Sequence, residues 1–488
     1  MSDRSRYKAV SPSADSWIYT GLLILIFWAP LPLGSNRTWA IGLLFSLTFI
    51  LFISTGWVWL RRWNLAWQRV SLFKWPLALL LAMVSLTWLQ TLPLPAAWVQ
   101  AISPMAAQAQ APQTWMTLSL DVYQTRLMGV LAFTYFSAFW VVIMTVRDAN
   151  RLDGLAQVLV YSGVLQTVLG AVLLSVQADY RIFYSHVSHT QMIGTFVNRN
   201  SMAGYLCMCL SMGVGLMLSR LSDNAGLAMT WKARVVNVIA FILSSKMRLR
   251  LLLIIMVIGL VLTRSRMGNT AFFTALLVVG LVAIVLARNT APKTIALIAS
   301  LVIIDVLVIG TWVGLEKVVD RIQNTELTVA DGGASESIEA RTKAARTALA
   351  LVQDFVVAGS GGGSFYNLFL TYRTPDFGYS YVDHTHNDYV EIASDYGVVG
   401  LGILGLLVAL TLWKTLTVLA KRRSTLPLGI AFGVAMSIVG LLVHSTVDFN
   451  LQIPSNAITI VIILAMGWLA YTLPPGAKVS RAASRGDD

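Results

Sequence analysis

Charged side chains are scarce in this sequence, and their scarcity excludes most kinds of soluble fold. Asp, Glu, Lys and Arg make up 12% of the 488 residues, about half of the share found in ordinary soluble proteins. Apolar residues make up 56% of the chain, and the mean hydropathy is +0.69. A soluble protein could not cover its surface with so few charges, so the composition predicts an all-α polytopic membrane protein.

Motifs for several common activities are also missing. The chain contains no Walker loop, no dinucleotide fingerprint and no zinc-ligand spacing. Its two cysteines, Cys207 and Cys209, stand two residues apart in one apolar run, so on a helix they point in different directions and share neither a disulfide nor a metal. No small-residue cleavage site follows the apolar run from Trp17, so no signal peptide is expected. We therefore expect neither a metal nor another cofactor.

Long apolar runs are what the chain does contain. A helix needs about 20 mostly apolar residues to cross a bilayer, and twelve stretches come close to that length. Residues 235–245 are not counted among them, and we expect this segment to lie at the membrane interface or to insert only part of the way into the bilayer. The predicted spans are 17–33, 39–60, 76–92, 126–146, 155–176, 201–219, 245–263, 269–287, 294–315, 397–418, 427–446 and 456–473.

Positive charge is distributed unevenly between the two sides of these spans. With the N-terminus in the cytoplasm, the inward-facing segments hold 24 of the 36 Lys and Arg residues. This asymmetry follows the positive-inside rule, so both termini are predicted to be cytoplasmic. The formal net charge of +13 is therefore a topology signal, together with an attraction to anionic lipid headgroups. Nucleic acid is not an expected partner.

This topology divides the chain into five segments, of which a large outward-facing loop is the most distinctive. In that loop, residues 335–355 predict an amphipathic helix with Ile338, Ala345, Leu349 and Val352 on one face, followed by a flexible glycine-rich turn at 359–363. The segments are a cytoplasmic tail at 1–16, nine transmembrane helices in 17–315, the outward loop with amphipathic helices at 316–396, three transmembrane helices in 397–473 and a cytoplasmic tail at 474–488.

Two histidines lie where the large loop meets the tenth span. The sequence from His384 to Asp388 is expected to begin the helix of that span. On such a helix His384 and Asp388 lie one turn apart and can share a hydrogen bond, whereas His386 faces elsewhere. An imidazole is a suitable base for an alcohol at neutral pH, although both histidines also fit a structural role at the membrane interface. A third metal ligand is not evident, so no metal site is predicted.

Arginines gather near the same outward face. The planar guanidinium group suits bidentate phosphate binding, whereas a single arginine at this depth also fits snorkelling to lipid phosphates. Several arginines on one face favour an anionic substrate. They are Arg199 at the mouth of the sixth span, Arg264 and Arg266 in the short turn between spans seven and eight, and Arg341 in the large loop.

Three other polar residues lie in or beside the spans. Asp305 stands in the middle of the ninth span, where an isolated acid serves proton transfer or bonds to a neighbouring helix. His444 and Asp448 close the eleventh span on the outward side, where they complete the same cavity or cap the helix end.

The chain resembles the O-antigen ligase and polysaccharide polymerase superfamily of bacterial membrane glycosyltransferases. The ligase signature is His, then Asn, Ser or Gln, then nine residues, Gly, two residues and finally Gly, Thr or Tyr. Here His386-Asn387, Gly397 and Gly400 meet it in full. Further elements similar to the superfamily, over about residues 190–460, are the Asn198-Arg199-Asn200 turn, the Ser265-Arg266 turn, Arg341, and His444 with Asp448.

The resemblance implies a metal-independent glycosyltransferase with a GT-C-like fold in the bacterial inner membrane, its active site facing the periplasm. Its partners would be a glycan donor on undecaprenyl pyrophosphate, a glycan acceptor, membrane lipids and a chain-length regulator protein. His386 would be the general base, and Arg199 and Arg266 would bind the pyrophosphate. Supporting contacts to the substrate would come from Arg341, Asn387, His384, Arg264, His444 and Asp448.

The acceptor separates two functions within the superfamily. A polymerase extends another lipid-linked repeat unit, whereas a ligase transfers the glycan to lipid A-core. The start from Pro30 to Arg37 and the long first loop are more similar to exopolysaccharide or capsule polymerases, so polymerisation is the predicted function. A lipid-glycan flippase or transporter would share the basic twelve-span plan and Asp305, but its unusual residues are expected near the midplane rather than on one face.

Overall fold

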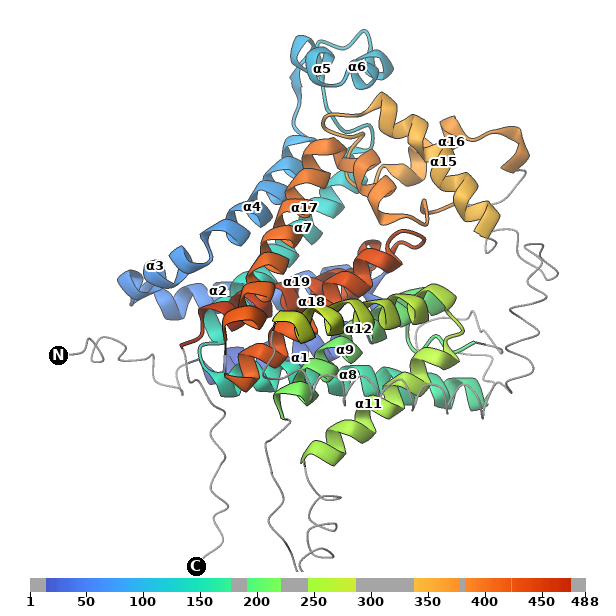
Figure 1. Cartoon of the computed structure of the whole chain (residues 1–488). Coiled ribbons are helices and arrows are strands. Elements are labelled where there is room, and N and C mark those ends of the chain that lie inside the picture. Colours follow the sequence, from blue (N-terminus) through green and yellow to red (C-terminus); the bar gives the residue numbers. More distant parts are fainter. Residues whose placement is uncertain are drawn as a thin grey trace, which may run out of the picture.

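The computed structural model describes residues 15–176, 191–220, 245–286, 338–377, 382–422 and 424–474. Helices account for most of them (Figure 1). Eight are long and apolar enough to cross a membrane, or nine if the bent pair of helices at 63–89 is one span. The prediction of an all-α polytopic membrane protein is therefore confirmed. The expected span 294–315 with Asp305 lies outside the described residues, as do nearly all of the segment 235–245 and of both tails, so the count of twelve stays a prediction.

Eleven of the twelve predicted spans coincide with helices. The first is short, because α1 ends at Trp28 just before the Pro30-Leu31-Pro32 turn. The helices of the bundle are α1 (Ser16–Trp28), α2 (Thr38–Leu60), α3 (Trp63–Leu72), α4 (Lys74–Leu89), α7 (Val122–Thr145), α8 (Ala149–Val176), α9 (Arg199–Ser219), α11 (Ser245–Leu262), α12 (Arg266–Leu286), α17 (Asp388–Lys421), α18 (Thr425–His444) and α19 (Pro454–Thr472).

Three of these helices form the centre of the bundle. The apolar window of α9 is entirely buried, and those of α18 and α19 are 83% and 89% buried, whereas that of α17 is only 22% buried. Small residues let the central helices approach closely, since a Cβ on Gly215 would collide with the backbone of Gly429 and Gly433. The outer helices therefore present their apolar side chains to lipid while α9 is shielded from it.

A second, smaller core joins two outward segments. The first is a short hairpin of β1 (Leu94–Pro95) and β2 (Trp115–Met116) with α5 (Ala96–Ile102) and α6 (Pro104–Gln110) between them. The second contains α15 (Ile338–Asp354) and α16 (Phe365–Tyr372), which lie beside α5 and α6 at one end of the bundle (Figure 1). The shared core is Val99, Ala106, Ala107, Met116, Leu118, Ala344, Ala348, Leu351, Phe355, Ala358, Phe365, Phe369 and Phe377.

The buried face of α15 differs from the predicted one. The helix itself is confirmed, but Leu349 is 47% exposed, and the core receives Ala344, Ala348 and Leu351 instead. The two small alanines allow close packing against the aromatic side chains of α16. Apolar side chains occur on both faces of this helix, so apolar periodicity alone did not identify the face that is buried.

A break in α17 receives the end of the glycine-rich loop. Gly397 has φ 64°, and a Cβ at this position would collide with the carbonyl group of Val357. Beyond the break, the Val398 N–H donates to the Val356 carbonyl at 2.8 Å. The backbone therefore requires the first glycine of the His-Asn-x9-Gly-x2-Gly motif.

Two buried polar side chains fix the glycine-rich loop. Gln90, at the end of α4, donates to the carbonyls of Ala358 and Asp395 at 2.7 and 2.8 Å. The Asp395 carboxylate accepts from the Gly363 N–H at 2.7 Å. The turn predicted to be flexible is thus tied to both α4 and α17, which holds the outward module in one position over the bundle.

Candidate functional site

The histidine segment precedes α17 rather than forming its first turn. The helix begins at Asp388, and the Asn387 side chain caps it by accepting from the N–H groups of Tyr389 and Val390. The prediction that the helix starts at His384 is wrong, because this cap satisfies the first free N–H groups and ends the helical backbone there. His386 has φ +53°, in the left-handed region that non-glycine residues seldom adopt outside functional sites.

His384 pairs with Glu391 instead of Asp388. Its Nδ1 lies 2.6 Å from Glu391 Oε1, and the other carboxylate oxygen accepts from the Thr385 N–H at 2.9 Å. Asp388 turns to the opposite side, where it accepts from Ser445 Oγ at 2.6 Å. The predicted one-turn pair is therefore replaced by two bonds that fold the segment back onto α17 and onto the α18–α19 loop.

The His384–Glu391 pair predicts a defined pH dependence of stability. Burial alone would lower the pKa of His384, but the charge and hydrogen bond of Glu391 outweigh it and raise the pKa to about 9. Because the folded-state pKa is raised, the stabilisation is complete below the unfolded value near 6.5 and is lost as pH rises through about 9. We expect the thermal stability of the wild type in detergent to exceed that of Glu391→Gln at neutral pH and to approach it above this pKa. If the thermal stabilities of the two proteins differ by the same amount across the whole pH range, this account is contradicted.

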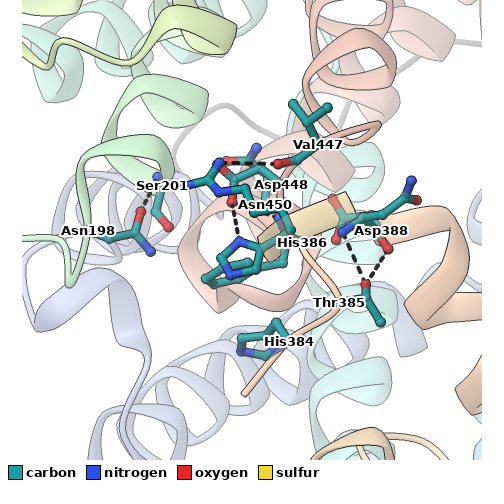
Figure 2. A network of polar contacts seen from close by, with 12 residues as sticks. Asn198, Ser201, His384, Thr385, His386, Asp388, Val447, Asp448 and Asn450 are labelled. Carbon is teal, nitrogen blue, oxygen red and sulfur yellow. Dashed lines mark hydrogen bonds and ion pairs between the residues drawn. The ribbon is translucent and has the colours of Figure 1, made fainter. Parts of the chain in front are cut away.

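Three of the predicted site residues meet at a fourth, Asp448, which Figure 2 shows beside His386. Its carboxylate lies 3.9 Å from Arg341 Nη1, 3.9 Å from His386 Nδ1 and 3.7 Å from His444 Nε2. Burial raises the pKa of Asp448, but the three neighbours more than offset this and leave it below its ordinary value. Asp448 is therefore ionised at neutral pH and places a negative charge beside the two imidazoles.

Many polar atoms around Asp448 are buried without a hydrogen bond among the described residues. A buried polar atom without a partner costs about 1–3 kcal/mol, so such a cluster indicates a place that takes up water or the polar groups of a ligand. The atoms are Arg341 Nε, His386 Nδ1, both ring nitrogens of His444, Asp448 Oδ2, Asn450 Nδ2 and Asn456 Oδ1.

An aromatic ring separates the two histidines of the segment. Phe449 stacks on His384 with 4.2 Å between ring centroids and meets His386 edge-on at 5.0 Å. Since Asp448 and Phe449 are adjacent in the chain, one short loop fixes both the charge partner and the orientation of His386. Sequence reasoning missed Phe449, because a phenylalanine between two membrane spans carries no signal of its own.

Asn387 contributes to the site through structure. Its Oδ1 caps α17, and its Nδ2 donates to the Thr446 carbonyl at 2.9 Å. With both ends of the amide engaged, the side chain anchors the histidine segment to the α18–α19 loop. The close view in Figure 2 contains both this loop, with Asp448 and Asn450, and the start of α9, with Asn198 and Ser201.

Helix packing brings the arginine-bearing turns to this end of the bundle. Arg199 is the first residue of α9 and Arg266 the first of α12. A Cβ on Gly268 would meet Ala203, so the first turns of these two helices lie side by side. Helix N-termini carry partial positive charge, which adds to that of the guanidinium groups and favours an anion.

The first turn of α9 also contacts the loop that carries Asp448. A Cβ on Gly204 would collide with the Asn450 amide, and Asn456 donates to the Ser201 carbonyl at 3.0 Å. Arg199 and Arg266 thus share one end of the bundle with Asp448, and exposed Arg264, with φ +54°, lies in the turn before α12. Asp448 is contacted directly by Arg341, His386 and His444. The other three arginines lie at the same end of the bundle because of the packing of the helices that carry or follow them.

The described part of the chain contains no group of three or more His, Cys, Asp or Glu side chains placed to hold a metal ion. The two cysteines are free and buried within α9.

Comparison with known proteins gives one family match. Residues 251–404 match the O-antigen ligase family. The matched region includes most of α11, all of α12, the α15–α16 module, the histidine segment and α17 to a point beyond its break at Gly397. No curated protein matches the chain.

Proposed function

The match over residues 251–404 supports the O-antigen ligase and polysaccharide polymerase superfamily, and from this premise we propose that the chain polymerises glycan repeats carried on undecaprenyl pyrophosphate. The match itself supports a membrane glycosyltransferase that acts on lipid-linked glycans. The polymerase role, the inner membrane and a periplasmic active site belong to the proposal. The observation that carries it is the meeting of Arg341, His386 and His444 at Asp448.

His386 is the proposed general base. Its Nδ1 faces the Asp448 carboxylate, which favours a proton on this nitrogen and leaves Nε2 as the acceptor. As the acceptor hydroxyl oxygen bonds to the anomeric carbon, its proton passes to Nε2. The negative charge of Asp448 stabilises the imidazolium that forms, in the way an aspartate assists a histidine base in hydrolases.

The arginines act on the leaving group. The bond between the anomeric carbon and the pyrophosphate oxygen breaks with its electron pair on oxygen, and attack from the opposite face inverts the anomeric centre. Arg199 and Arg266, at the starts of two adjacent helices, are placed to neutralise this developing charge. Arg264 and Arg341 support them, and His444 Nε2 lies 3.7 Å from the Asp448 carboxylate.

Chelation is expected to leave the reaction intact. Guanidinium groups and helix N-termini supply the positive charge at the leaving group, so a divalent ion is redundant there. The measurement compares initial rates of purified protein before and after treatment with EDTA. Complete loss that Mg²⁺ or Mn²⁺ restores would overturn this mechanism, and Asp383, Asp388 and Glu391 would then be examined as metal ligands.

One assay tests both the reaction and the acceptor. Purified protein receives undecaprenyl-pyrophosphate-linked repeat units in the presence or absence of lipid A-core, without nucleotide. A ladder of products on the donor lipid, formed without lipid A-core, supports polymerisation. Transfer that requires lipid A-core and places the glycan on it would establish a ligase instead. Movement of the lipid across a vesicle bilayer with no new glycosidic bond would indicate a transporter.

A further inference from the structure

The hairpin module of α5 and α6 has an uncharged surface with exposed amides and two exposed tryptophans. Residues 93–120 contain no Asp, Glu, Lys, Arg or His, but they contain four glutamines and two tryptophans. Trp98 and Trp115 are 63% and 60% exposed, although the module shares a packed core with α15 and α16. Two large rings left outside a packed core indicate a surface that meets a partner.

The module is rigid, which holds these rings in place before any partner arrives. Gln110 donates to the carbonyls of Ala106 and Thr117 at 2.9 and 2.8 Å, and its oxygen accepts from the Thr117 N–H. Pro95 pairs with Trp115 across the two short strands, which fixes the backbone that carries the second ring. A preorganised surface of this kind binds without a large ordering cost.

We infer that the surface around Trp98 and Trp115 binds the glycan part of the lipid-linked substrate, several sugars away from the reacting bond. The inference rests on the proposed function. An indole face packs against the apolar C–H face of a sugar ring, and the exposed amides of Gln100, Gln108 and Gln113 both donate to and accept from sugar hydroxyls. Neutral amides beside aromatic rings suit a hydroxyl-rich ligand better than an ionic one.

The lack of charge separates this surface from one that binds a bilayer. Anionic membrane surfaces attract Lys and Arg, and the exposed rings of Trp63 and Trp67 on α3 do lie in a segment with Arg61, Arg62 and Lys74. The hairpin module offers no such cation. Its glutamines would also lose hydrogen bonds in an apolar environment, so the bilayer is the weaker partner for this surface.

Helix α15 connects the surface to the candidate site. Arg341, near its start, lies 3.9 Å from Asp448, and just past its end the Ser360 carbonyl accepts from the N–H of Leu120, in the segment that follows β2. At 1.5 Å per residue, the helix between them covers about 20 Å. A glycan whose end reacts at His386 can therefore reach the tryptophans only if it is several sugars long.

The test varies the length of the glycan. Full-length wild type, Trp98→Ala, Trp115→Ala and the double variant receive lipid-linked donors that carry one sugar or at least two complete repeats. We expect the KM of the double variant to rise at least about fivefold with the long substrate, as loss of aromatic contacts produces, and to rise far less with the single sugar. Trp63→Ala, which removes an equally exposed ring from the other side of the protein, should behave as wild type with both.

The outcomes separate this inference from the proposed function. If the wild type transfers neither substrate, the proposed function fails. If the wild type transfers both and the loss in the double variant does not grow with glycan length, the glycan surface is rejected. Tryptophan fluorescence gives a readout that needs no turnover. Subtracting the emission spectrum of the double variant from that of wild type leaves the emission of Trp98 and Trp115, which should change when free repeat oligosaccharide is added. Quenching of that emission by brominated phospholipid, with no response to the oligosaccharide, would assign the surface to the bilayer.

Discussion

Replacing His386 with alanine is expected to lower the rate of glycan transfer by about 10²–10⁴-fold, the usual effect of losing a general base. The side chain contributes little packing, so membrane insertion and stability in detergent should change little. Initial rates with lipid-linked repeats, measured beside thermal unfolding of the same preparations, provide the check. Activity within about threefold of wild type would reject His386 as the base.

The backbone at His386 allows a sharper version of this experiment. Its φ of +53° strains any residue with a Cβ, and a left-handed residue of this kind costs about 1–3 kcal/mol. His386→Gly removes both the imidazole and the strain, so this variant should be at least as stable as wild type while it is as inactive as the alanine variant. A variant that is stable but inactive cannot owe its loss of activity to misfolding.

His384→Ala serves as the matched control. This histidine bonds to Glu391 and stacks on Phe449, and it lies outside the group that meets at Asp448. Its loss should reduce stability more than His386→Ala does and should reduce transfer less. If His384→Ala proves the more damaging to transfer at equal stability, the roles of the two histidines must be exchanged.

The lengths of the apolar runs were sufficient to locate the described membrane helices but not the start of α17. Eleven predicted spans coincide with helices because lipid demands long uninterrupted apolar stretches. Where a polar segment meets a helix, several residues compete as the cap, and here Asn387 accepts from two N–H groups and sets the boundary. Because the helix begins after Asn387, both histidines lie before it, and their partners differ from those predicted.

The residues that orient the site could not be found from the sequence for a different reason. Glu391 is an ordinary acid in the first turn of a helix, and Asn450 is one of many loop asparagines. Glu391 gains its role when the histidine segment folds back onto α17, and Asn450 gains its role when the α18–α19 loop packs against α9. The histidine segment also bonds to that loop, about sixty residues further along the chain, as from Asn387 to Thr446. Spacing within one segment carries no information about such a contact.

Arg266→Lys is expected to be nearly as damaging to transfer as Arg266→Ala. A lysine keeps the charge at the start of α12 but offers a single point donor, whereas the guanidinium group binds two phosphate oxygens at once. A lost hydrogen bond to a charged group corresponds to about 1.5–3 kcal/mol, or roughly 10- to 150-fold in kcat/KM. Arg199→Lys at the adjacent start of α9 should show a similar loss.

Arg346→Lys is the control for the effect of shortening a guanidinium side chain on the same side of the protein. Arg346 is exposed on α15, five residues beyond Arg341, and its replacement should leave transfer unchanged. Product inhibition by inorganic pyrophosphate adds a readout that membrane anchoring would not affect, since it should weaken in Arg266→Lys and Arg199→Lys but not in Arg346→Lys. Full activity and unaltered inhibition in both site variants would show that these arginines anchor the helices at the lipid headgroups and do not bind the leaving group.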